Sequence, residues 1–219
     1  MISGASAYLA PLAALATLLG GWLVVRFLPK DKPTAMRMLS GMAAGYLVAV
    51  TLARVLPEAF AHGSSTTPFW VIGGFLLVHV IEHGISPHFH YGEETHHHHH
   101  GRAASIMALV GLSLHSFMDG MSLTAAMRCD TGLGHLVFMG ILLHRIPEGG
   151  TIASIFLARG SSARSAILAA MTLALAALVG AVSTAWVTVP LGPVLGLSAG
   201  LALYVASSDL LPQAQTPGR

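Results

Sequence analysis

The chain has 219 residues, of which 54% are hydrophobic and only 9% are charged. So few charges cannot cover the surface of a water-soluble protein of this length, and the composition therefore excludes an ordinary soluble domain. The formal charge is +2, and the eleven Lys and Arg residues occur singly between apolar blocks, which gives no support to nucleic acid as a partner. The single cysteine, Cys129, excludes an internal disulfide and a CxxC metal site.

Successive apolar blocks of about 20 residues predict an all-α fold, a polytopic bundle of transmembrane helices with the lipid bilayer as solvent. We expect a single transmembrane domain over 1–219, and seven helices within it. They are predicted over 6–28, 36–60, 69–86, 103–127, 134–158, 164–189 and 193–212. Short polar segments separate them, and the longest is a His-rich loop at 87–102. The first block ends, rather than begins, with basic residues, so we interpret it as a helix and not as a cleaved signal peptide.

Basic residues predict the orientation of the bundle, because loops rich in Lys and Arg remain in the cytoplasm. In the seven-helix scheme Arg128 falls on one side of the membrane. The remaining loop cations fall on the other side: Arg26, Lys30, Lys32, Arg37, Arg102, Arg159, Arg164 and Arg219. The N-terminus is therefore predicted outside and the His-rich loop in the cytoplasm. The high Ala and Gly content points to a bacterial inner membrane.

Two predicted helices carry ionisable residues in the middle of apolar sequence, where each of them is costly. His115 and Asp119 lie four residues apart in the fourth helix, with Ser116 beside the histidine, and His144 and Glu148 have the same spacing in the fifth. This spacing places both side chains of a pair on one helix face. Two imidazoles and two carboxylates facing each other would form a four-coordinate site suited to zinc or a related divalent ion. The alternative is that each pair is a neutralised polar contact that holds helices together.

The segments HSFMDG at 115–120 and HRIPEG at 144–149 resemble the metal-binding motifs in the fourth and fifth helices of the ZIP (Zrt/Irt-like) family of metal-ion transporters. Weaker likenesses follow in the right order. LARVLPEAF at 52–60 resembles the end of that family's second helix, and SAGLALYVASSDLLPQ at 198–213 resembles its seventh. The resemblance implies a fold that normally has eight helices, whereas this sequence provides about seven, as a short prokaryotic-type member would. Either such a short chain is completed by forming a homodimer, or this sequence is a truncated product of a longer one.

The resemblance also implies which residues bind the transported ion: His115, Asp119, His144 and Glu148. Two positions depart from the family pattern. Ser116 stands where a two-ion site usually has Asn, and Arg145 stands where it has an acidic residue. Because an Arg side chain is a permanent cation that cannot bind metal, we predict a single bound ion, with Arg145 neutralising the carboxylates.

Further histidines suggest a route toward the cytoplasm. His79, Glu82 and His83 share a face of the third predicted helix, and they form either part of the ion pathway or an interfacial polar anchor. The loop carries mobile imidazoles that would handle metal weakly, although five consecutive histidines could also be the remains of a purification tag. These loop residues are His88, His90, His96, His97, His98, His99 and His100.

These features predict a transporter that moves divalent metal ions toward the cytoplasm, with Zn2+ first and Fe2+, Mn2+ or Cd2+ as further candidates. The sequence has no GxxxxGK[ST] motif for ATP, so an ion gradient would drive transport. One alternative is a membrane metal sensor or metal-binding accessory protein that does not transport. The other is an intramembrane metalloenzyme. The sequence lacks HExxH and offers no general base beyond the four ligands, and we therefore expect no enzymatic activity.

Overall fold

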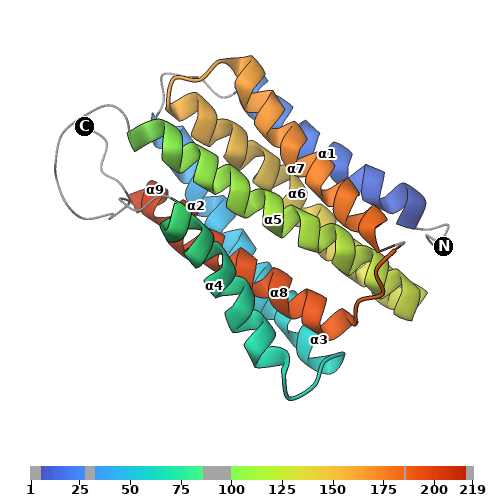
Figure 1. Ribbon diagram of the computed structural model, residues 1–219. Helices are drawn as coiled ribbons and strands as arrows, with labels where there is room; N and C mark the ends of the chain where they lie inside the picture. Colours follow the sequence, from blue (N-terminus) through green and yellow to red (C-terminus); the bar gives the residue numbers. More distant parts are fainter. Residues whose placement is uncertain (1–5, 28–32, 86–99, 185, 216–219) are drawn as a thin grey trace.

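A computed structural model describes residues 6–27, 33–85, 100–184 and 186–215 of the chain. Within these ranges the chain is almost entirely helical and contains no β-strand, and the helices lie side by side in one bundle (Figure 1). The prediction of an all-α helix bundle is confirmed.

Seven continuous helices run through the described residues, close to the seven predicted ones. The first is α1 (Ser6–Phe27). The second passes from α2 (Pro33–Val50) through a π-helical turn, η1 (Thr51–Val55), into α3 (Leu56–Ala61). Four helices follow: α4 (Thr67–Ile85), α5 (His100–Cys129), α6 (Thr131–Ala158) and α7 (Ala163–Ser183). The last is made of α8 (Leu191–Tyr204), a second π-helical turn, η2 (Val205–Leu210), and α9 (Leu211–Gln215).

Side-chain caps determine where two of these helices begin. Asp130 alone separates α5 from α6, and its Oδ1 accepts a hydrogen bond from the backbone N–H of Leu133 at 2.8 Å. Ser162 caps α7 in the same way, since its Oγ accepts from the backbone N–H of Ser165 at 3.1 Å. Each cap satisfies one of the N–H groups that lack a partner in the first turn of a helix.

One helix end differs from the prediction. The sequence predicts a helix over 164–189, whereas α7 ends at Ser183. Residues 187–189 are Val-Thr-Val, whose β-branched side chains favour extended backbone, and Pro190 disfavours a helical conformation in the residue before it. The chain therefore leaves the helix early and becomes helical again in α8.

The helices pack in two groups that meet in the middle of the bundle (Figure 1). In the first group α1, α5, α6 and α7 pack on one another, and in the second α4 packs on α8 while α2 packs on η2 and α9. The groups meet where α5 contacts α8 and α6 contacts α2. Small residues allow the closest contacts, because a Cβ on Gly180 of α7 would collide with the carbonyl of Phe117 in α5. The centre of the bundle is therefore shared by α2, α5, α6 and α8.

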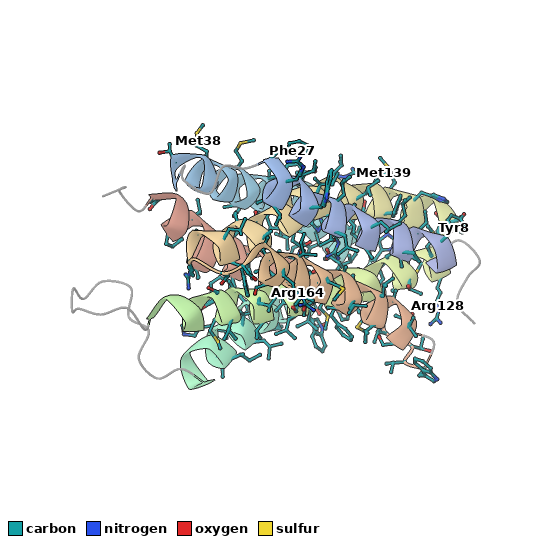
Figure 2. The ribbon with its side chains drawn as sticks, turned by 90° about the horizontal axis from the view of Figure 1, so that it is seen from above. Tyr8, Phe27, Met38, Arg128, Met139 and Arg164 are labelled. Carbon is teal, nitrogen blue, oxygen red and sulfur yellow. The ribbon has the colours of Figure 1, made fainter. Side chains whose placement is uncertain are left out.

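Five segments of the described residues are long and apolar enough to cross a membrane: Tyr8–Phe27, Ala44–Ala61, Ser105–Cys129, Ala163–Ser183 and Leu191–Ser208. A shorter apolar helix covers Thr67–Ile81. Large apolar side chains project from the outer surface of the bundle, as Phe27 and Met139 do in Figure 2, where they are 66% and 50% exposed. Lipid tails are the natural neighbours of such a surface.

Consecutive helices run in opposite directions, so the connections alternate between the two ends of the bundle (Figure 1). Tyr8 and Arg128 lie at the end where α5 joins α6, the α5–α6 end (Figure 2). Met38 lies toward the opposite end, where α6 joins α7, the α6–α7 end.

Candidate metal centre

His115, Asp119 and His144 form a buried cluster in the middle of the bundle. One ligand atom from each, an imidazole nitrogen or a carboxylate oxygen, lies within 4.8 Å of the other two. Asp119 Oδ2 is 3.5 Å from His115 Nε2 and 2.8 Å from His144 Nε2. The three residues are only 3–5% exposed. Two imidazoles from different helices thus converge on one carboxylate, which is a donor set that suits zinc.

His144 is oriented by its own helix. Its Nδ1 lies 2.9 Å from the carbonyl oxygen of Gly140, one turn earlier in α6. A carbonyl oxygen can only accept, so Nδ1 carries the hydrogen and Nε2 is the nitrogen available to an ion. Backbone partners of this kind fix the orientation of metal-binding histidines. His144 therefore faces Asp119 on α5 rather than Glu148, the residue one turn along its own helix.

The ring nitrogens of His115, which have no hydrogen-bond partner, also indicate a metal site. Neither of its ring nitrogens makes a hydrogen bond with any described residue, although the side chain is almost completely buried. A buried polar group without a partner destabilises the folded state. A cation bound by His115 and Asp119 together would give Nε2 of His115 a partner. The residues present therefore fit a metal ion.

Glu148, the fourth predicted ligand, lies beside the cluster and not within the group of three. Its Oε2 accepts a hydrogen bond from Arg145 Nη1 at 2.9 Å, and its Oε1 accepts from Ser116 Oγ at 2.6 Å. Both oxygens therefore already have partners. The two positions that depart from the family pattern, Ser116 and Arg145, are the residues that hold this carboxylate.

Arg145 lies between the two buried carboxylates and is itself fully buried. Its Nη2 is 3.2 Å from Asp119 Oδ2, and its Nη1 pairs with Glu148 and also donates to Ser116 Oγ at 2.7 Å. One cation and two anions give these three side chains a formal net charge of −1. Without Arg145, two negative charges would be left together inside the bundle, which is strongly unfavourable.

Ser198 of α8 belongs to the site, and sequence reasoning missed it. Its Oγ donates a hydrogen bond to Asp119 Oδ1 at 2.8 Å, and the residue is buried. In the sequence it lies within GLSAG at 196–200, which is typical of a small-residue packing face. The one available signal was a hydroxyl in an apolar helix. Ser198 brings a third helix into contact with the cluster.

The other residues predicted to handle metal do not join this cluster. His79 is exposed on α4, where its ring centroid is 5.8 Å from that of Tyr204. The backbone of Glu82 and His83 belongs to α4, but their side chains lie outside the described part of the chain. The side chains of the loop histidines also lie outside the described part of the chain, and of these residues only the backbone of His100 is described. They are His88, His90, His96, His97, His98, His99 and His100.

Two cavities meet at His144. The larger is lined by His115 and Asp119 and extends along η1, α6 and α8 toward the α5–α6 end. The smaller is lined by Glu148 and Thr151, toward the α6–α7 end. Because His144 lines both, the cluster lies between two spaces that extend in opposite directions.

Comparison with known proteins gives this site a family context. The family model described as ZIP Zinc transporter matches residues 93–217, which are more than half of the chain and include the whole cluster. The chain belongs to the ZIP zinc transporter family. The resemblance stated from the two sequence motifs is thereby confirmed.

ZIP relatives of different lengths resemble this chain. Zinc transporter ZupT of Escherichia coli is 27% identical over 93% of this chain and 84% of ZupT. Zinc transporter ZIP13 of Pongo abelii is 26% identical over 81% of this chain, and zinc transporter ZIP5 of Homo sapiens is 31% identical over 61% of it. The chain spans 58% of the length of ZIP13 and 25% of that of ZIP5. All three relatives carry the name of a transporter and none that of an enzyme.

Proposed function

We propose that this ZIP chain carries divalent transition-metal ions, zinc foremost, across a lipid bilayer, and that the ion binds to His115, Asp119 and His144. The observation that supports this most is the position of the cluster. Its three ligand atoms lie within 4.8 Å of one another, between two cavities that extend from His144 in opposite directions. A protein that only senses or stores metal needs access from one side. Spaces on both sides favour passage of the ion.

Glu148 is proposed as the next ligand on the ion's path. It lines the smaller cavity together with His144, so an ion that moves from the cluster toward the α6–α7 end reaches its carboxylate. Arg145 holds that carboxylate when no ion is present. Since the guanidinium brings a permanent positive charge to the place where a second dication would otherwise sit, the proposed occupancy is one ion.

Uptake of radiolabelled zinc into proteoliposomes tests the proposal. We expect saturable uptake by the native chain and a fall of about tenfold or more in His115→Ala and in Glu148→Ala, because each substitution removes a group that contacts the ion. His135→Ala is the matched control. This histidine is exposed in the first turn of α6, where its Nδ1 bonds to the carbonyl of Thr131, and its loss should leave uptake unchanged.

Two other outcomes would contradict transport through this site. Stoichiometric zinc binding without uptake by the native chain would replace the transporter with a sensor or accessory protein. Native uptake in both His115→Ala and Glu148→Ala would place the ion path elsewhere. Competition by Fe2+, Mn2+ and Cd2+ in the same assay ranks the ions.

We propose a bacterial inner membrane as the location, with the N-terminus and the α5–α6 end outside and the His-rich loop in the cytoplasm. The asymmetry of Lys and Arg supports this orientation. Cys129, the one cysteine of the sequence, is exposed at the α5–α6 end, so its chemical labelling can show on which side of the membrane that end lies. A membrane-impermeant maleimide is expected to label Cys129 in spheroplasts, with Cys129→Ser as the background control. Labelling confined to inverted vesicles would reverse the orientation.

A further inference from the structure

Ser122 of α5 and Thr151 of α6 are buried hydroxyl residues, 2% and 0% exposed, whose oxygens have no hydrogen-bond partner among the described residues. Other hydroxyls of the same two helices bond to a backbone carbonyl about one turn earlier. Thr124 donates to Gly120 at 3.3 Å, and Ser154 donates to Thr151 at 2.8 Å. A hydroxyl inside an apolar helix is ordinarily satisfied in this way. Ser122 and Thr151 are exceptions, and their hydroxyl groups are available to a ligand from outside the helix.

Both exceptions lie one turn beyond a carboxylate of the site. Ser122 follows Asp119 by three residues and Thr151 follows Glu148 by three, a rise of about 4.5 Å along each helix. Because α5 and α6 run in opposite directions, the two hydroxyls lie on opposite sides of the cluster (Figure 1). Ser122 lines the larger cavity, and Thr151 lines the smaller one.

The neighbouring carboxylates bond to other residues and not to these two hydroxyls. Asp119 accepts hydrogen bonds from Ser198 on Oδ1 and from Arg145 on Oδ2. Glu148 accepts from Arg145 and Ser116 on its two oxygens. Each unpartnered hydroxyl therefore lies one helical turn from a carboxylate and lines a cavity, where it offers an oxygen of the kind that cations bind.

We propose that Ser122 and Thr151 are transient oxygen-binding positions for the cation on the two sides of the cluster. Ser122 acts on the approach from the α5–α6 end, and Thr151 acts together with Glu148 on the departure toward the α6–α7 end. The inference rests on the proposed transport function and its direction. A divalent ion reaches and leaves the cluster with water in its shell, and each hydroxyl hydrogen-bonds to that water or binds the ion directly.

Transport kinetics and equilibrium binding together test the inference. Zinc binding by calorimetry is expected to stay within about twofold of the native affinity in Ser122→Ala and Thr151→Val, because neither hydroxyl belongs to the cluster. Ser122→Ala should raise the KM for zinc uptake about fivefold, and Thr151→Val should lower the maximal rate about fivefold, the change that one lost hydrogen bond produces. Thr151→Ser keeps the hydroxyl and should restore the rate.

The matched controls are Ser154→Ala and Thr124→Val, which remove hydroxyls that bond to helix carbonyls. Both should retain native KM and maximal rate. Native kinetics in Ser122→Ala and Thr151→Val would overturn the inference while leaving transport intact, and so would equal losses in the controls. Absence of uptake by the native chain would overturn the proposed function and the inference with it.

Discussion

Replacing Asp119 with asparagine is expected to abolish zinc binding and zinc uptake together. Asp119 is the carboxylate on which both histidines of the cluster converge, at 3.5 Å from His115 and 2.8 Å from His144. Asparagine keeps the shape of the side chain but removes the negative charge that a dication needs. Loss of a residue that hydrogen-bonds to a metal ligand costs about tenfold to a hundredfold in metal affinity, so loss of the charged ligand itself should exceed that range.

The same substitution should also destabilise the zinc-free protein. Arg145 would keep Glu148 as a partner but lose its ion pair with Asp119, inside a bundle where the guanidinium is fully buried. We expect the free energy of unfolding to fall by about 2–3 kcal/mol. Calorimetric zinc titration, proteoliposome uptake and thermal unfolding in detergent measure the three effects.

Ser198→Ala is the control for Asp119→Asn, because it removes one hydrogen bond to Oδ1 and leaves the carboxylate in place. It should lower zinc affinity by about tenfold to a hundredfold, clearly less than Asp119→Asn. Saturable uptake in Asp119→Asn, at anything near the native level, would remove the cluster from the transport path.

Replacing Arg145 with glutamine is expected to produce the largest loss of stability of any single change at the site. Arg145 forms ion pairs with Asp119 at 3.2 Å and with Glu148 at 2.9 Å, and its removal leaves two buried carboxylates without a cation. Breaking a buried ion pair in this way costs about 3–5 kcal/mol. The zinc-free variant should therefore unfold at a clearly lower temperature than the native protein.

Zinc should restore the stability of the Arg145→Gln variant, because a dication can neutralise the two carboxylates that have lost the guanidinium as a partner. The measurement is the rise in Tm on adding zinc, which we expect to be larger for Arg145→Gln than for the native chain. Arg145→Lys keeps the positive charge but not the forked geometry of the guanidinium. Its zinc-free stability should lie between that of Arg145→Gln and that of the native protein. Arg145→Asp should bind two zinc ions per chain. Equal zinc-free stability of Arg145→Gln and the native protein would show that the guanidinium does not neutralise the site.

The fold was predictable because the bounds of each helix depend on nearby sequence, namely the length of its apolar block and the helix-ending residues that follow. All seven predicted helices lie within a few residues of the observed ones, and the main difference, the early end of α7 at Ser183, also has a local cause in the Val-Thr-Val-Pro sequence that follows. Five segments of the described residues have the length and apolar character of a membrane span. Two of the seven helices are missing from those five: α4, whose apolar part covers only Thr67–Ile81, and α6, which carries His144, Arg145 and Glu148 in its middle.

The site was predictable only in part, because its pairings depend on how helices are rotated against one another. Spacing correctly indicated that His115 and Asp119 share a face of α5, and they lie 3.5 Å apart. Spacing could not show that His144 turns to Asp119 while Glu148 turns to Arg145, since that depends on the depth and rotation of α6 against α5. Ser198 comes from 79 residues away, and no local pattern links it to Asp119. The assignment of ligands to the ion stays a prediction.

Asp130 is the sole residue between α5 and α6, so the cluster and both of its charged neighbours come from one helical hairpin. Each helix alone would bring ionisable side chains into lipid, at roughly 2.5–3.5 kcal/mol for a charged residue near the helix centre. Entering as a pair, the helices bring Asp119 against Arg145 and reduce that cost before α7 and α8 have been synthesised. We therefore expect the translocon to release α5 and α6 into the bilayer together, with the metal-binding hairpin assembled during synthesis and Ser198 added last.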